Sequence, residues 1–150
     1  MITAAISYIW LKMEWNKPCT VSIGKIDYPR GSLSVLEYPD TLPFEPVDAR
    51  WLTAETLDAI TEGRAHYAAN LAITALTGSL RIVTEQGGRT RDIVLACPNK
   101  IAYVPAMTWY EITEFSQGAV AMIVSDALPD ALDVITDKRE FDSIVSYGIE

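Results

Sequence analysis

The chain has 150 residues, of which 49% are hydrophobic, and its 20 acidic and 12 basic residues give a formal net charge of −8. This length and hydrophobic content exclude an intrinsically disordered chain and predict one domain with a sizeable core. No basic stripe interrupts the acidic composition, which argues against a nucleic acid as a partner.

The first feature in chain order is an apolar stretch over residues 1–13. It is shorter than the roughly 20 residues that a membrane-spanning helix needs, and it lacks the basic start of a signal peptide, so no membrane partner is expected. We predict an N-terminal extension over residues 1–18 and a single domain over residues 19–150. The extension is expected to pack as a strand or a helix on the body or on a partner subunit, unless it results from a misassigned start codon.

Turn-forming residues recur at short intervals after this extension, which predicts many short β-strands. Between positions 80 and 85 the side chains alternate in character, as expected of a half-buried strand, and Gln86–Gly88 predicts a tight hairpin. The predicted strands are Thr20–Ile23, Ser32–Glu37, Ala49–Thr53, Ala68–Leu76, Ser79–Thr84, Thr90–Ala96, Ile101–Val104, Thr108–Thr113 and Ala119–Ser125.

Two segments break the strand pattern. Thr53 can cap a short helical turn at the start of Thr53–Arg64, and the apolar residues after Pro129 fit two short helices. The whole pattern predicts an all-β barrel or sandwich with a helical tail. The acidic residues of the tail lack the spacing of an EF-hand calcium loop and are expected to form a solvated face: Asp126, Asp130, Asp133 and Asp137.

Histidine occurs once in the chain, at position 66. An imidazole has an ordinary pKa of about 6.5, which makes His66 the first candidate for acid–base chemistry; the alternative is a structural histidine in a barrel wall. A single histidine without a cysteine pair does not hold zinc or iron, so no metal cofactor is expected. Cys19 and Cys97 form no Cys-x-x-Cys motif and are expected to be reduced thiols of a cytoplasmic protein.

Several motifs resemble, in order and spacing, those of the sugar-nucleotide 3,4-ketoisomerases, which are WxcM-like cupins. Asp27–Leu33 is similar to the family's D-x-R-G-S-L motif, and Arg64–His66 falls where the family carries H-A-H. Similar matches to I-P-F, L-N-G-S, V-P-P-x-x-W-H and the family's tail are found at Leu42–Phe44, Leu76–Ser79, Val104–Tyr110 and Phe141–Val145.

The resemblance implies a cupin jelly-roll β-barrel with short C-terminal helices that assembles as a homodimer. It implies a cytoplasmic isomerase that moves the keto group of a dTDP-4-keto-6-deoxyhexose between C4 and C3 by proton transfer. The reaction would need no metal or redox cofactor and would serve the biosynthesis of deoxy and amino sugars. Two alternatives stay open: a non-catalytic cupin that binds a nucleotide sugar, and an isomerase or epimerase for another nucleotide sugar.

The expected catalytic residues are His66, Tyr110, Arg64 and Tyr67. His66 would carry a proton between the two carbons, while Tyr67, Tyr110 or a water would serve the oxygens. The chain has Arg64 where the family has its first histidine, Tyr110 where a histidine usually follows the tryptophan, and Asp48 where an arginine is common. A guanidinium cannot act as a base, but Arg64 can stabilise an enediolate oxygen and lower the pKa of His66.

The residues expected to bind the substrate are Arg30, Gly31, Arg50, Trp51, Tyr103 and Trp109. Arginine suits a diphosphate because its planar head donates two parallel hydrogen bonds, and aromatic rings can stack on thymine. The alternatives are a solvated surface charge for each arginine and core packing for each aromatic residue. Gly31 is expected in a turn that needs a positive φ.

Overall fold

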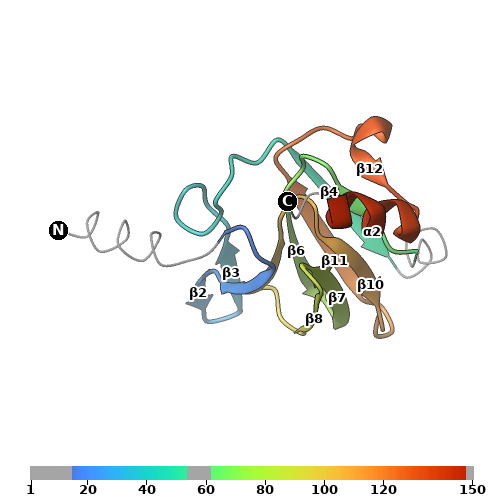
Figure 1. Cartoon of the computed structure of the whole chain (residues 1–150). Coiled ribbons are helices and arrows are strands. Elements are labelled where there is room, and N and C mark those ends of the chain that lie inside the picture. Colours follow the sequence, from blue (N-terminus) through green and yellow to red (C-terminus); the bar gives the residue numbers. More distant parts are fainter. Residues whose placement is uncertain (1–14, 54–61, 148–150) are drawn as a thin grey trace.

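The structure is a computed structural model that describes residues 15–53 and 62–147. The N-terminal stretch 1–14 and the helical turn expected just after Thr53 lie outside the described residues. The elements, in chain order, are β1 (Cys19–Ser22), β2 (Gly24–Tyr28), β3 (Gly31–Val35), β4 (Asp48–Thr53), β5 (Ala65–His66), β6 (Leu71–Thr77), β7 (Leu80–Gln86), β8 (Arg89–Leu95), β9 (Lys100–Val104), β10 (Trp109–Thr113), β11 (Val120–Ser125), η2 (Ala131–Asp133), β12 (Val134–Ile135) and α2 (Lys138–Tyr147) (Figure 1).

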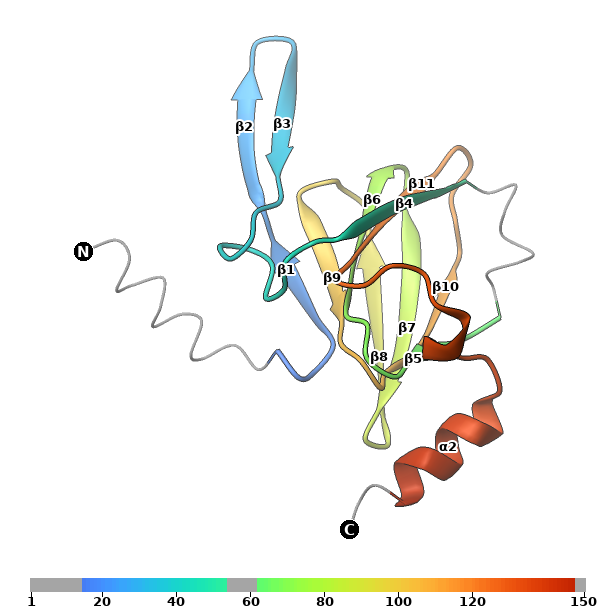
Figure 2. The same ribbon diagram turned by 90° about the horizontal axis from the view of Figure 1, so that it is seen from above.

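Two antiparallel sheets form the body of the protein. The larger has the strand order β1-β9-β6-β11-β4 and the smaller has the order β10-β7-β8. One buried apolar cluster takes side chains from β6, β9 and β11 of the first sheet and from β7, β8 and β10 of the second. The sheets therefore share one core, and Figure 2 shows their strands gathered around it. This confirms the predicted all-β, cupin-type fold class.

Strand β7 shows why the sequence pattern predicts this packing. Leu80, Ile82 and Thr84 are buried, whereas the residues between them are only partly so. Successive strand residues point to opposite faces, so one face meets the core and the other meets solvent. The hairpin to β8 closes through Gly87 and Gly88, which have φ values of 58° and 74°. Such a two-residue turn needs positive φ, which confirms the predicted hairpin.

The strands β2 and β3 form a separate hairpin that projects from the body (Figure 2). All five residues of β2 are exposed, and so are the large apolar side chains of Ile26, Tyr28 and Leu33. Gly31 pairs with Tyr28 in this hairpin and is not among the glycines with positive φ. The expectation that Gly31 needs a positive φ was therefore wrong, because it begins an extended strand.

The C-terminal segment contains one 3-10 turn and one α-helix, with the short strand β12 between them. The helix α2 buries Phe141 against Trp109, with ring centroids 5.7 Å apart. Gly63 makes this packing possible, because a Cβ atom there would lie 2.3 Å from Nε1 of Trp109. Strand β12 pairs with β5, so the tail fixes the strand that carries His66.

Candidate active site

A cavity of about 370 Å³ lies beside His66. Its polar wall contains side chains from β4, β5, β10 and the tail, whereas Leu52, Ile112 and Ile123 supply an apolar wall. The polar residues used below are Arg50, Arg64, His66, Tyr110, Asp130 and Asp133. This volume is within the range typical of small-molecule sites.

The backbone around His66 is held on both sides. On one side Arg64 and Tyr110 exchange backbone hydrogen bonds of 3.0 and 2.8 Å, and the His66 carbonyl accepts the Met107 N–H at 2.7 Å. On the other side His66 pairs with Val134 of β12. Ala65 lies fully buried, so alternation along the strand turns Arg64 and His66 to the opposite, cavity side.

His66 and Tyr110 form the polar centre of the cavity. The Tyr110 hydroxyl lies 3.1 Å from Nε2 of His66, and their ring planes are inclined by 20°. Burial lowers the pKa of His66 below 6.5, Asp133 opposes this, and Arg64 and Arg50 lower the pKa further. Burial also raises the pKa of Tyr110 to about 12. At neutral pH the site therefore combines a neutral imidazole, which can accept a proton, with a protonated phenol.

The lowering of the His66 pKa by Arg64 agrees with the electrostatic effect expected from the sequence. Arg50 enters the same cavity from β4 and pairs with Asp48, with 2.5 Å between Nε and Oδ2. Two guanidinium groups thus face the imidazole and the phenol. They are suitably placed to stabilise negative charge on a bound ligand.

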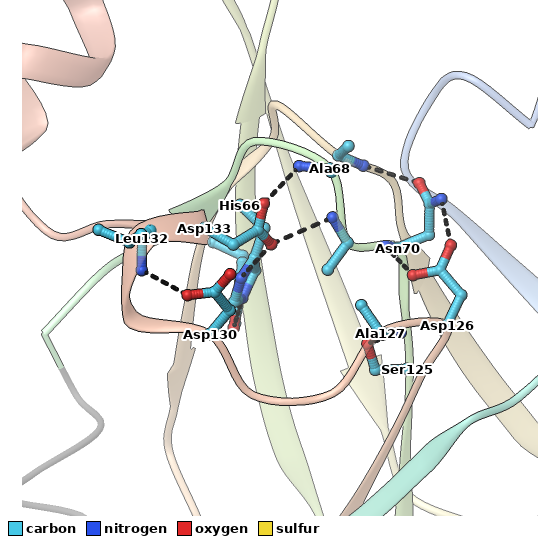
Figure 3. A network of polar contacts seen from close by, with 12 residues as sticks. His66, Ala68, Asn70, Ser125, Asp126, Ala127, Asp130, Leu132 and Asp133 are labelled. Carbon is cyan, nitrogen blue, oxygen red and sulfur yellow. Dashed lines mark hydrogen bonds and ion pairs between the residues drawn. The ribbon is translucent and has the colours of Figure 1, made fainter.

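Four backbone N–H groups near the site are bonded by acidic residues of the tail, in the network that Figure 3 draws. Asp133 accepts from Ala68 and Ala69, and Asp126 accepts both the N–H and the side-chain amide of Asn70. The fourth is the N–H of Leu132, which Asp130 accepts at 2.9 Å.

Asp137 similarly accepts the N–H of Arg139 at the start of α2. The expected solvated face is found for Asp130 and Asp137, which are exposed, whereas Asp126 and Asp133 are half-buried. All four carboxylates also accept backbone amides, a role that the sequence did not indicate. Within residues 15–53 and 62–147, no group of three or more His, Cys, Asp or Glu side chains is placed to hold a metal.

Asp133 lines the cavity beside His66, and sequence reasoning did not place it there. Its Oδ2 lies 3.6 Å from Nδ1 of His66, and both side chains are 16% exposed. The sequence places Asp133 in an acidic cluster, but it carries no sign that this residue meets a histidine so far away in the chain. The short pairing of β12 with β5 brings them together.

The other expected site residues lie outside this cavity. Tyr67 is exposed and donates a hydrogen bond of 3.2 Å to Glu140 of α2. Tyr103 is buried against Trp15 and Phe44, and Trp109 is buried in the cluster under α2.

Arg30 and Gly31 lie at the turn of the projecting β2–β3 hairpin. Trp51 is 69% exposed and lies between Arg50 and Leu52, which face the cavity, so strand alternation turns it away. Of the expected residues, the structure therefore brings together His66, Tyr110, Arg64 and Arg50.

Known proteins resemble this chain in sequence and in fold. It is 27% identical over 128 residues to the TDP-4-oxo-6-deoxy-alpha-D-glucose-3,4-oxoisomerase of Aneurinibacillus thermoaerophilus, and the match covers 85% of this chain and 89% of that protein.

No helix within the described residues has the length and apolar character needed to cross a membrane.

Solved structures share the fold. The sugar 3,4-ketoisomerase QdtA of Thermoanaerobacterium thermosaccharolyticum, solved in complex with TDP, matches with a TM-score of 0.80 at 19% identity, over 92% of this chain and 100% of that one. A 3,4-ketoisomerase of Helicobacter canadensis matches with a TM-score of 0.79 at 24% identity, over 87% and 98% of the two chains. Residues 17–146 match the family model described as "FdtA: WxcM-like, C-terminal", and we conclude that this chain belongs to that family.

Proposed function

We propose that this protein is a 3,4-ketoisomerase acting on a dTDP-4-keto-6-deoxyhexose. The observation that carries the proposal is the neutral imidazole of His66, which faces a cavity with a phenol 3.1 Å away and two arginines beside it. Membership of the family and the activity of the relative from Aneurinibacillus thermoaerophilus support the same reaction. The cavity of about 370 Å³ suits the sugar, and the nucleotide would extend over the neighbouring surface.

The reaction moves two hydrogens and leaves the sum of atoms unchanged. A base removes the proton on C3, the electron pair of that bond forms a C3–C4 double bond, and the C4 oxygen becomes an enediolate oxygen. The enediolate oxygen on C4 then takes up a proton while O3 loses its own, and return of a proton to C4 gives the 3-keto sugar. Each proton transfer through a positioned side chain contributes a factor of roughly 10²–10⁴ to the rate.

The residues of this chain match these steps. His66 acts as the base, because its lowered pKa keeps the imidazole unprotonated at neutral pH. Tyr110 donates to the developing oxyanion, because its pKa of about 12 keeps the phenol protonated. Arg64 and Arg50 stabilise the enediolate or the diphosphate, since a guanidinium keeps its charge through the cycle. No step in this scheme uses a metal or a redox cofactor.

A test uses dTDP-4-keto-6-deoxyglucose in deuterated buffer, followed by NMR. We expect the 3-keto product to carry deuterium at C4 and the returned substrate to carry it at C3, and we expect His66→Gln to abolish both while TDP still binds. Absence of product and of deuterium at C3 and C4 with the wild type would refute catalysis of this reaction.

Arg64 and Tyr110, at the two positions where the family carries histidine, favour a second candidate, a cupin that binds a nucleotide sugar without turning it over. That alternative predicts a higher Tm with TDP and no deuterium exchange. A larger Tm shift with UDP or GDP than with TDP would instead favour an isomerase or epimerase for another nucleotide sugar.

We also propose that the protein is a cytoplasmic homodimer. The β2–β3 hairpin exposes Ile26, Tyr28 and Leu33, and a second copy would remove this apolar surface from water. Arg30 and Gly31 lie on this hairpin, so they would contribute to binding only where it reaches a second copy.

The described cysteines, at positions 19 and 97, are both unpaired, which fits a reducing compartment. Light scattering on the wild type and on a Leu33→Lys variant tests the assembly. A monomeric wild type would contradict the dimer.

A further inference from the structure

A carboxylate lies on the side of His66 that faces away from Tyr110. Oδ2 of Asp133 is 3.6 Å from Nδ1, whereas the Tyr110 hydroxyl is 3.1 Å from Nε2. The first distance is an ion-pair contact and is longer than a hydrogen bond. Both ring nitrogens of His66 thus have a polar neighbour, and the two neighbours differ in character. One is an acceptor, and the other can donate.

The position of Asp133 is fixed independently of His66. Its Oδ1 accepts the N–H of Ala68 at 2.8 Å and its Oδ2 accepts that of Ala69 at 3.2 Å. Figure 3 shows the Asp133 carboxylate directed towards Ala68. Its backbone carbonyl also accepts the N–H of Tyr67 at 2.9 Å. The next residue, Val134, pairs with His66 in the β12–β5 ribbon. The carboxylate therefore has little freedom to turn away from the imidazole.

This arrangement selects one tautomer of the neutral imidazole. A carboxylate accepts hydrogen bonds and repels a nitrogen lone pair, so Nδ1 must carry the hydrogen. Nε2 then carries the lone pair and accepts from the Tyr110 hydroxyl. Fixing one ring nitrogen through the group that faces the other is a general way of orienting a working histidine.

We propose that Asp133 is a positioning residue that holds His66 in the Nδ1–H tautomer, with the Nε2 lone pair directed towards Tyr110 and the cavity. The inference rests on the proposed function only for its kinetic consequence, since the tautomer is a property of the free protein. Asp133 also offsets Arg64 and Arg50 when the imidazole takes up a proton. The other charged groups that line the cavity are Asp48 and Asp130.

The experiment exploits the fact that the chain has one histidine, so its imidazole nitrogen signals need no assignment. Long-range 1H–15N correlation spectra of the ligand-free, full-length wild type are expected to show Nδ1 protonated and Nε2 unprotonated. In Asp133→Asn the amide oxygen can keep the Ala68 hydrogen bond, and the NH₂ then faces Nδ1 at the cost of the Ala69 hydrogen bond. We therefore expect the tautomer to switch to Nε2–H and the pKa of His66 to fall, because the Asp133 charge that raises it is lost.

The matched control is Asp126→Asn, which alters the other carboxylate that holds this loop. Asp126 bonds Asn70, does not line the cavity, and is not among the groups that shift the pKa of His66. We expect this variant to keep the wild-type tautomer and kcat, whereas Asp133→Asn should lower kcat by roughly 10–100-fold with KM little changed.

A wild type that carries the hydrogen on Nε2 would overturn the proposal without any variant. An Asp133→Asn protein that keeps both the Nδ1–H tautomer and the wild-type kcat would overturn it as well. If the wild type fails to isomerise the sugar but the tautomer switches in Asp133→Asn, the positioning role stands and the proposed reaction fails.

Discussion

Replacing Tyr110 by phenylalanine removes one oxygen from the site and keeps the buried ring. Tyr110 is 5% exposed and packs in the cluster between the two sheets, so its ring contacts persist in the variant. The hydrogen bond that is lost is the neutral one of 3.1 Å to Nε2 of His66. Such a bond contributes about 0.5–1.5 kcal/mol net, and the free energy of unfolding should fall by no more than this.

The effect on the reaction should be much larger than the effect on stability. In the proposed mechanism the phenol is the proton donor next to the base, and a positioned donor contributes roughly 10²–10⁴ to the rate. We expect kcat for the 4-keto to 3-keto conversion to fall by a factor in this range. TDP binding should be nearly unchanged, because the lost group faces the imidazole and carries no charge.

The assay is an NMR time course of the sugar signals, with urea denaturation of the same samples. Tyr38→Phe serves as a control, because it deletes an exposed tyrosine hydroxyl outside the cavity. Wild-type kcat in Tyr110→Phe would refute the donor role of the phenol. A loss of stability well above the stated range would mean that the kinetic loss reports damage to the core.

Three further predictions address the electrostatics and the tail. The pKa of His66 is lowered in the folded state, so the unfolded chain binds this proton more readily. The free energy of unfolding of the wild type should therefore fall relative to that of His66→Gln as the pH drops below about 6.5. Urea denaturation that gives the same difference between the two proteins at neutral and acidic pH would contradict this. Arg64→Gln should raise the pKa of His66, which an NMR titration of the imidazole measures directly, and an unchanged or lower pKa would count against the role given to this charge. Phe141→Ala should lower the free energy of unfolding by about 3–5 kcal/mol, because the ring is 2% exposed and packs α2 against Trp109. A loss near zero in chemical denaturation would show that α2 packs on the body without this ring.

The sequence predicts strand β7 well because it buries one face and its residues alternate. Strands β7 and β10 both form within a residue or two of the predicted bounds. Strands β5 and β12 were not predicted, since two residues are too few to show any period. Strand β2 was also missed, because both of its faces are exposed and it pairs with β3 alone.

The sequence predicted the residues at the centre of the cavity but not the carboxylate that faces His66 from behind. The lone histidine and the motif around it indicate His66, Arg64 and Tyr110, and these three meet at the cavity. Aromatic residues at motif positions were ambiguous, because Trp109 and Tyr103 are equally suited to stacking and to packing, and both are buried in clusters. The pairing of the two-residue strands β12 and β5 brings Asp133 next to His66, and no local sequence pattern predicts this pairing.

The charges around His66 explain how one imidazole can serve a site that also contains arginines. Arg64 and Arg50 favour an enediolate, but the same charges resist protonation of the imidazole and lower its pKa. A base beside two cations alone would take up the C3 proton with difficulty. Asp133 supplies the opposing charge from the far edge of the ring, where it does not compete with the arginines for the substrate oxygens. An arginine at position 64 is thus compatible with catalysis because a carboxylate lies behind the histidine, and the effects of Arg64→Gln and Asp133→Asn on the His66 pKa should have opposite signs.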